Sequence, residues 1–200
     1  MAYEAIWYYT SIPDDVVDCL SRDLENLTNN DEFLESQTKS GPDYQMRDSS
    51  NLWIPDTHWV CGLMWHYINL ANKNNFRYDI DGFDGGSIQY TRYQTDNYYN
   101  WHKDDGVGNA YTPLPDPQED FIVSNTQKIR KLSITVQLSS HEDYTGGEVQ
   151  FMEDQKKTFF APKKKGTVIV FDSRLPHRAK KVLTGERRSL VGWVVGPQWR

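Results

Sequence analysis

The sequence predicts a mainly β, α+β domain of the antiparallel sandwich or jelly-roll class, buttressed by N-terminal helices. Two helical patterns occupy the first part of the chain, and short strand-like runs separated by Gly, Asp and Asn fill the rest. Helices followed by many short strands favour helices packed against one face of antiparallel sheets. We therefore expect one domain over residues 1–200, with helical support over 1–75 and a jelly-roll core over 76–200.

The first helix is expected over residues 13–28. Pro13 and the two aspartates after it suit a first turn, and apolar residues recur at helical spacing as far as Leu27. A polar stretch that contains glycine follows over 36–51. A second helix is expected over about 55–71, where apolar residues again fall along one face.

Short runs rich in β-branched and aromatic residues predict the strands. These runs are 76–80, 87–94, 98–104, 130–138, 148–151, 157–161, 167–171, 177–182 and 187–195. The run 130–138 alternates strictly, with Ser133, Thr135 and Gln137 on one face and aliphatic residues on the other. This pattern is typical of a half-buried strand on a solvated sheet, and equally of an inner jelly-roll strand whose polar face lines a wet cavity.

The composition, with 38% hydrophobic and 25% charged residues, is ordinary for a soluble globular protein. No apolar run approaches a membrane span, and the first residues lack a signal-peptide pattern. Cys19 and Cys61 show no metal or redox spacing, so a cytoplasmic location is the expectation, in a host cell if the protein is viral. The sequence does not indicate an oligomeric state.

The net charge of −6 is unevenly distributed along the chain. Residues 1–100 hold 6 of the 22 Lys and Arg but 16 of the 28 Asp and Glu, so residues 101–200 carry a positive balance. This asymmetry suits ordinary solvated surface charge. It also suits a basic mouth for an anionic cosubstrate or substrate.

The stretch 98–104 carries the first sign of chemistry, because His102 and Asp104 are two residues apart. In an extended strand such residues point to the same side. With a second imidazole they would form a 2-His-1-carboxylate facial triad, which leaves open positions on a non-haem Fe(II). A lone His-x-Asp is weak evidence, so the assignment depends on the rest of the chain.

The segment 105–128 follows these residues directly and gives little strand signal. It contains two early glycines and three prolines. A loop of this length in a compact domain is usually functional or disordered. We expect it to act as a lid over the site, with a plain surface excursion as the alternative.

Several further motifs occur in a fixed order after this stretch. They are Tyr93, Tyr99, His102-x-Asp104, Gly147 with Glu148, Gly166, His177, Gly185 and Arg187. Over residues 90–193 this order resembles the 2-oxoglutarate/Fe(II)-dependent dioxygenases, and most of all their prolyl-4-hydroxylase-like branch. The resemblance implies a double-stranded β-helix fold, with Fe(II), and 2-oxoglutarate and O2 as cosubstrates, and ascorbate as a candidate reductant. It also implies that His102, Asp104 and His177 bind the iron.

The resemblance also implies which residues bind the cosubstrate. Arg187 lies ten residues beyond His177, where the family places a basic residue that pairs with the distal carboxylate of 2-oxoglutarate. Ser189 lies on the same strand face and is expected to assist it, while Arg188 is expected to point away into solvent unless the register shifts by one. Tyr93 and Gln137 match positions that contact the cosubstrate in some relatives.

Substrate contacts are implied for Arg130, Trp193 and Tyr99. Arg130 matches a position that contacts peptide in some prolyl hydroxylases, and Trp193 resembles a tryptophan near the substrate mouth. Tyr93 and Trp193 also suit an alternative role as core aromatics.

The activity implied is hydroxylation of a peptidyl residue such as proline, with release of succinate and CO2. A peptide or protein partner is therefore expected, and no membrane. The same chemistry on a free amino acid, another small molecule or an alkylated nucleobase is the alternative. Lysines at 163–165 and 180–181 could contact phosphates, but no nucleic-acid motif is present, so a nucleic-acid partner is not expected. A non-catalytic jelly-roll binding module is a remote third class.

Overall fold

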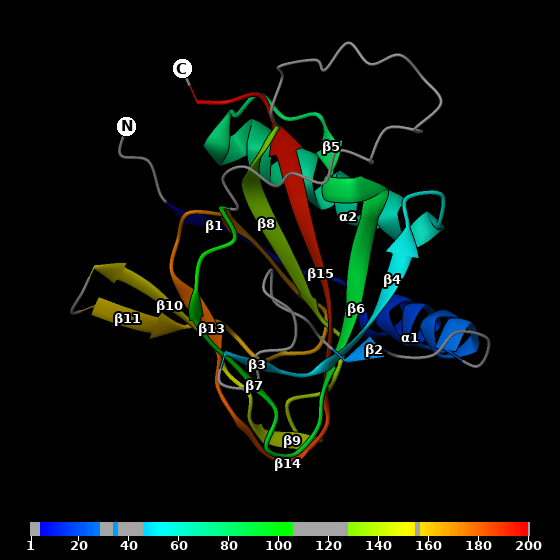
Figure 1. Ribbon diagram of the computed structural model, residues 1–200. Helices are drawn as coiled ribbons and strands as arrows, with labels where there is room; N and C mark the ends of the chain where they lie inside the picture. Colours follow the sequence, from blue (N-terminus) through cyan, green and yellow to red (C-terminus); the bar gives the residue numbers. More distant parts are fainter. Residues whose placement is uncertain (1–4, 29–33, 36–45, 106–127, 155–156, 200) are drawn as a thin grey trace, which may run out of the picture.

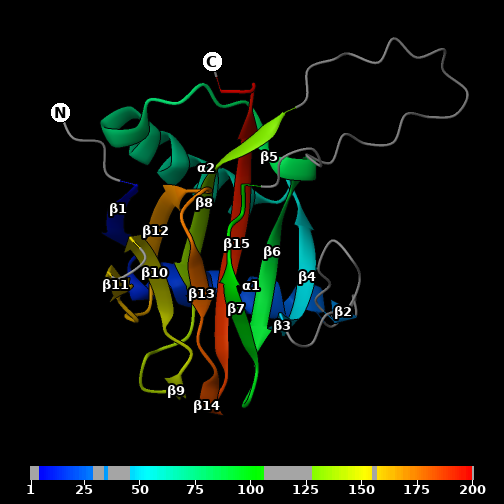
Figure 2. The same cartoon turned by 60° about the vertical axis from the view of Figure 1, so that its left-hand side comes forward.

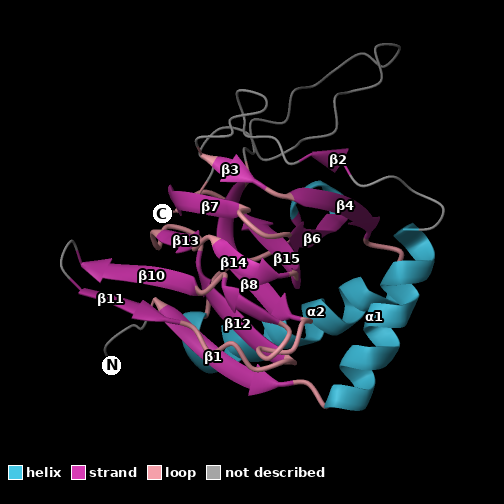
Figure 3. Cartoon of the chain, turned by 90° about the horizontal axis from the view of Figure 1, so that it is seen from below, coloured by secondary structure: helices cyan, strands magenta, loops and turns pink. Residues whose placement is uncertain are grey.

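The structure is a computed structural model that describes residues 5–28, 34–35, 46–105, 128–154 and 157–199. Two antiparallel sheets face each other, with two helices on the outer side of the larger sheet (Figures 1 and 3). This is the jelly roll that the sequence predicts, and that prediction is confirmed. Within the described residues, no helix is both long and apolar enough to cross a bilayer.

The large sheet contains most of the long strands. Its order is β1 (Ile6–Ser11), β12 (Thr167–Asp172), β8 (Ile129–Gln137), β15 (Arg187–Gly196), β6 (Ser87–Tyr93), β4 (Ser50–Pro55) and β2 (Leu34–Glu35), with β5 (Gly82–Phe83) paired to β15. The small sheet has the order β11 (Lys157–Phe160), β10 (Val149–Asp154), β13 (His177–Ala179), β7 (Tyr98–His102) and β3 (Arg47–Asp48). A short ribbon of β9 (Tyr144–Gly146) and β14 (Val182–Gly185) closes one end. Figure 2 shows β13 and β7 in front of the large sheet.

Strand β8 shows how the sequence separates the two faces of the large sheet. Its aliphatic residues Leu132, Ile134 and Val136 are buried in the main core, which includes residues of helices α1 (Asp14–Thr28) and α2 (Trp59–Ala71). Its polar residues face the small sheet instead. Of the two interpretations of this alternation, the structure supports the inner strand whose polar face lines a cavity.

The predicted strand at 76–80 is wrong. Helix α2 continues into a π-helical turn, Asn72–Phe76, which ends at Arg77 with a φ of 56°. The Asn72 side chain then binds both backbone groups of Tyr78, donating to its carbonyl at 2.9 Å and accepting from its N–H at 2.8 Å. These hydrogen bonds occupy the groups that a partner strand would need.

The prediction of helices alone over 1–75 is also incomplete. Strands β1 and β4 come from this part and pair with β12 and β6. Strand β4 begins inside the polar stretch 36–51 and ends at the expected start of the second helix, so neither pattern revealed it. The expected strand 177–182 is divided into β13 and β14, and the expected lid 105–128 lies outside the described residues except at its ends.

Candidate metal and cosubstrate site

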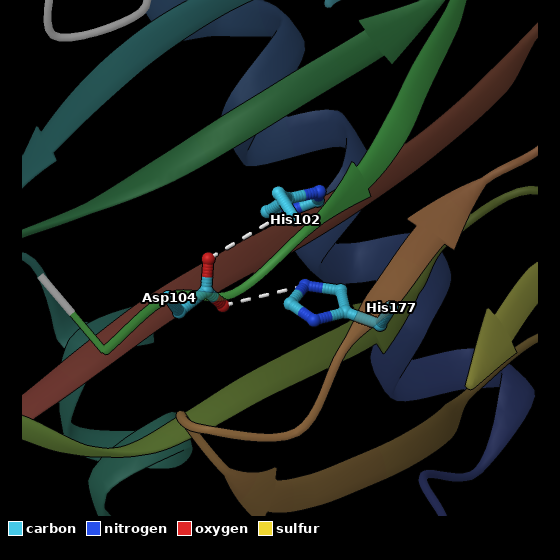
Figure 4. A group of neighbouring side chains, drawn as sticks. All are labelled: His102, Asp104 and His177. Carbon is cyan, nitrogen blue, oxygen red and sulfur yellow. Dashed lines mark ion pairs between the residues drawn. The ribbon is translucent and has the colours of Figure 1, made fainter. Parts of the chain in front are cut away.

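Two adjacent strands of the small sheet bring His102, Asp104 and His177 together (Figure 4). His102 ends β7 and His177 begins β13, and the two residues are direct cross-strand partners. Asp104 follows β7, and its backbone N–H donates to the carbonyl of Ser173 at 2.9 Å. One ligand atom from each residue lies within 4.8 Å of the others, so the group could hold a metal ion.

In both histidines one ring nitrogen makes a hydrogen bond within the fold and the other faces Asp104. The Nδ1 of His102 lies 2.7 Å from the carbonyl of Asn100, and the Nδ1 of His177 lies 3.0 Å from the carbonyl of Leu175. A carbonyl only accepts, so each Nδ1 donates to it, and each Nε2 is the nitrogen left for a metal. Both Nε2 atoms face Asp104, at 3.6 Å from His102 and 3.4 Å from His177.

The Asp104 carboxylate is held from the large sheet. The Ser133 hydroxyl donates to its Oδ2 at 2.7 Å, and the Ser173 hydroxyl lies 3.0 Å from that of Ser133. Burial alone would raise the pKa of Asp104, but the imidazoles of His177 and His102 and the Ser133 hydroxyl outweigh it and lower the pKa below its usual value. The residue is therefore a carboxylate at neutral pH, as a metal ligand must be.

For His102, unlike Asp104, burial outweighs the attraction of the neighbouring opposite charge. Burial, followed by the charge of the neighbouring His177, lowers the pKa of His102 to about 3, against the weaker effect of Asp104. The ring is thus neutral at physiological pH. A neutral imidazole with a free Nε2 is the form that binds transition metals.

An extra residue in β7 places Tyr99 beside His102. The pairing of β7 with β13 passes from His102 opposite His177 to Tyr99 opposite Ala179, three residues against two. Residues three apart on a regular strand face opposite sides, and one extra residue restores them to the same side. The Tyr99 ring consequently stacks on the His102 ring, with centroids 3.5 Å apart and planes 13° apart.

Arg187 lies in the large sheet at the start of β15 and is only 4% exposed. Its Nε donates to Gln137 Oε1 at 3.1 Å, and its guanidinium carbon lies 5.4 Å from the centre of the Tyr93 ring. Tyr93 and Arg187 are cross-strand partners, as are Gln137 and Ser189. The structure therefore brings together the four residues that the resemblance assigns to the cosubstrate.

The hydroxyl of Ser189 is a buried polar atom with no hydrogen-bond partner among the described residues. Ser189 and Arg187 line the same cavity as the three candidate metal ligands. A buried hydroxyl without a partner is costly, and a bound polar ligand removes that cost. The pair thus forms a donor set suited to a carboxylate.

Two consecutive glycines bring Tyr144 close to this donor set. Gly147 has a φ of 63°, and a Cβ there would lie 3.1 Å from the Tyr144 ring and 3.3 Å from the Arg187 side chain. The Tyr144 hydroxyl accepts from Gln137 Nε2 at 3.0 Å. Burial raises the pKa of Tyr144, against the opposing effect of Arg187, so the hydroxyl stays neutral beside the guanidinium.

The cavity holds about 520 Å³ of empty space, including the part open to solvent. This volume lies in the range of small-molecule sites. Tyr99 and Trp193 line it with the metal and cosubstrate residues. Burial raises the pKa of the Tyr99 hydroxyl to about 12, and that hydroxyl is therefore neutral.

Arg130 lies beside the cavity and is paired with Asp84, and its contact with substrate stays a prediction. It does not line the cavity in the described part of the chain. Its Nε donates to Asp84 Oδ2 at 2.6 Å, and its guanidinium carbon lies 4.4 Å from the centre of the Trp193 ring. Arg130 is therefore placed to hold Trp193 against the cavity wall.

Arg188 points away from the cavity, as the alternation predicts, but it is not simply solvated. Its Nη1 pairs with Glu25 of α1 at 2.6 Å, and its Nε lies 3.9 Å from Glu186. The side chain thus links β15 to the helix that covers the outer face of the sheet. This corrects the expectation of a free surface arginine.

Sequence reasoning missed Arg47 and Tyr144 as cavity-side residues. Arg47 is 6% exposed and lines the cavity from β3. It lay in a polar stretch with no pattern that would have revealed it. The Gly146–Gly147 pair was the available signal for Tyr144, since positive φ at both glycines turns the chain back toward Arg187.

The lysines considered for phosphate binding are largely paired with carboxylates. Lys163 and Lys180 both approach Glu148, at 3.7 and 3.5 Å, and Lys181 approaches Asp96 at 3.1 Å. Lys165 pairs with Asp18. This pairing argues against a phosphate-binding surface at these positions.

Comparison with known proteins identifies the family. The family model described as the 2OG-Fe(II) oxygenase superfamily matches residues 88–195, more than half of the chain. A PKHD-type hydroxylase of Crocosphaera subtropica is 25% identical over 173 residues, covering 86% of this chain and 71% of that protein.

Solved structures of prolyl hydroxylases share the fold. A Pseudomonas putida prolyl-4-hydroxylase has a TM-score of 0.66 at 18% identity, covering 96% of this chain and 93% of the other. A Trichoplax adhaerens prolyl hydroxylase, solved with a peptide fragment of a hypoxia-inducible factor, has a TM-score of 0.69 at 16% identity, covering 94% and 83%. The chain belongs to the 2OG-Fe(II) oxygenase superfamily and is a hydroxylase-type dioxygenase similar to the prolyl hydroxylases.

Proposed function

We propose that His102, Asp104 and His177 hold a single Fe(II) ion. The donor set fits this ion, because two imidazoles and one carboxylate on one side leave adjacent positions open for other ligands. The hydrogen bonds from each Nδ1 to a carbonyl and from Ser133 to Asp104 fix the ligands before the metal arrives.

Arg187 and Ser189 bind the distal carboxylate of 2-oxoglutarate in this proposal. The buried guanidinium donates to the neutral Gln137, so its charge is available to a ligand. The unpartnered Ser189 hydroxyl supplies a further donor. Tyr93 forms the wall beside them, and Gln137 with Tyr144 orients the arginine. Ascorbate as a reductant stays a prediction.

The substrate is a peptidyl residue, and proline is the candidate with most support. The structures described above are prolyl hydroxylases, one of them solved with a peptide fragment. The cavity wall supplies the aromatic faces of Tyr99 and Trp193, which suit an apolar ring. Trp53, which is 42% exposed, lies 6.2 Å from Trp193 and extends this aromatic surface outward.

The bound iron, with 2-oxoglutarate and O2, supplies the oxidative chemistry that converts the cosubstrate to succinate and CO2 and hydroxylates a C–H bond. The residues of the chain position the metal, the cosubstrate and the target side chain. Asp104 and the two histidines set the place of the metal, and Arg187 sets the direction of the cosubstrate. Trp193, held by Arg130, limits where a target side chain can sit.

The observation that carries the proposal is the convergence of the metal donor set and the Arg187–Ser189 donor set on one cavity. The test is 2-oxoglutarate turnover by purified Fe(II)-loaded protein, measured as succinate, followed by a screen of proline-containing peptides for a mass gain of one oxygen atom. His177→Ala should abolish succinate formation and retain the fold.

The screen also contains free amino acids and alkylated nucleobases. Hydroxylation of one of these, with no product from any peptide, would replace the peptidyl assignment and leave the reaction class intact. Absence of 2-oxoglutarate turnover under every condition would refute the reaction class itself.

A further inference from the structure

The cavity contains more positive charge than the metal and cosubstrate sites use. Arg47, Arg178 and Arg187 line it, against Asp104 as the single acidic side chain among the described lining residues. Fe(II) and the doubly charged 2-oxoglutarate would cancel each other, and Arg187 is assigned to the cosubstrate. Arg47 is the remaining guanidinium that is almost fully buried, at 6% exposed.

Neutral groups alone hold Arg47 within the described part of the chain. Its Nε donates to Ser49 Oγ at 2.9 Å, and its Nη2 donates to Asn51 Oδ1 at 3.1 Å and to Gln89 Oε1 at 3.2 Å. Its guanidinium carbon lies 4.8 Å from the centre of the Tyr99 ring. None of the ion pairs of the described residues involves Arg47, and these three hydrogen bonds use its Nε and Nη2.

A buried cation without a counter-charge is costly to maintain, and an anion that enters the cavity removes that cost. The position of Arg47 is also specific. It lies over the Tyr99 ring, and that ring also stacks on the imidazole of His102. An anionic group at Arg47 would thus lie close to the Tyr99 ring, on the β3 side of the cavity.

We propose that Arg47 binds a carboxylate of the substrate, so that the enzyme selects substrates in which the target residue carries or adjoins a carboxylate. This inference rests on the reaction class of the proposed function and specifies its substrates, peptidyl or free. The carboxylate can belong to the target amino acid itself, to a peptide C-terminus, or to a neighbouring acidic side chain. All three present the same chemistry to a guanidinium.

Matched pairs of probes test the proposal on the unaltered protein. The first pair is L-proline and L-prolinamide. The second is a short acetylated peptide that ends in proline and the same peptide with a C-terminal amide. The third is an acetylated and amidated peptide that contains Pro-Asp and the same peptide with Pro-Asn. We expect the carboxylate member of at least one pair to be favoured at least tenfold in kcat/KM, equivalent to about 1.4 kcal/mol. The pair that responds identifies the source of the carboxylate.

Variants at Arg47 then connect the preference to this side chain. Arg47→Gln should reduce the carboxylate preference in the responding pair to less than about threefold, and Arg47→Lys should restore part of it, since lysine keeps the charge without the planar fork. Arg92→Gln is the matched control, because Arg92 pairs with Glu186 and does not line the cavity. Circular dichroism and thermal unfolding exclude a general loss of folding.

The outcomes are distinguishable. The first outcome is normal 2-oxoglutarate turnover with no preference for the carboxylate member of any pair, either in product formation or in stimulation of turnover. This outcome would overturn the inference and leave the proposed function intact. A preference that survives in folded Arg47→Gln would overturn the assignment to Arg47. Absence of 2-oxoglutarate turnover in the unaltered protein would overturn the proposed function and this inference with it.

Discussion

Replacement of Arg187 by methionine should weaken 2-oxoglutarate binding much more than the same replacement at Arg188. Arg187 is buried and donates to the neutral Gln137, so its loss removes a charged partner from a desolvated carboxylate. A charge-assisted hydrogen bond is worth roughly 1.5–3 kcal/mol. The dissociation constant of 2-oxoglutarate should therefore rise by roughly 10- to 150-fold.

Arg188→Met is the matched control, with the same residue type one position away. Its pair with Glu25 is partly exposed, at 29% and 54% of the two side chains, so its loss should cost less than about 1 kcal/mol of folding stability. Cosubstrate affinity should not change. Calorimetric titration of the Mn(II)-loaded proteins with 2-oxoglutarate, in the absence of oxygen, measures the dissociation constant for each variant.

Equal losses of affinity in the two variants, or a larger loss in Arg188→Met, would refute the strand register on which the assignment rests. Arg187→Lys adds a graded comparison. The charge remains but the planar fork does not, so its affinity should lie between those of the unaltered protein and Arg187→Met.

Three further predictions follow from the buried groups. Ser133→Ala removes the donor to Asp104, so Mn(II) affinity measured by calorimetry should fall roughly 10- to 100-fold; unchanged affinity would show that the carboxylate needs no support. The free energy of unfolding of the metal-free protein, measured in urea, should decrease as the pH falls from about 6.5 toward 3. The reason is that the pKa of His102 is lowered in the folded state, so in this pH range the unfolded state binds a proton that the folded state does not. In His102→Gln the free energy of unfolding should depend less on pH. Burial, with a smaller effect of Asp56, raises the pKa of the Cys61 thiol to about 11. A thiol reagent at neutral pH should therefore modify the exposed Cys19 at once and the buried Cys61 only after unfolding. Two fast-reacting thiols in the native protein would contradict this prediction.

Strand alternation made much of the site predictable. Ser133, Thr135 and Gln137 share one face in the sequence pattern and share the cavity side of the sheet in the structure. The same alternation separated Arg187 from Arg188 correctly. The residues that converge from distant parts of the chain, such as His177, came from the family resemblance, because no local pattern specifies which strands become neighbours.

The parts that the sequence did not reveal depend on tertiary contacts. Arg47 is held by side chains of β4 and β6, and no period of two or of 3.6 records such a network. The run at 76–80 had the β-forming residues of a strand, but the Asn72 side chain took the hydrogen bonds of Tyr78. Tertiary contacts override local propensity at such positions.

The extra residue in β7 makes strand length a determinant of how His102 is held. Deletion of one residue between Tyr99 and His102 would restore a regular ladder with β13, with His102 opposite His177 and Tyr99 opposite Ala179, so both rings would stay on the cavity side. The carbonyl that accepts from His102 Nδ1 belongs to Asn100, inside the irregular stretch. On a regular strand the carbonyls point along the sheet toward the neighbouring strands, so this hydrogen bond would be lost. A chain one residue shorter here would therefore keep its aromatic platform and hold one metal ligand less firmly.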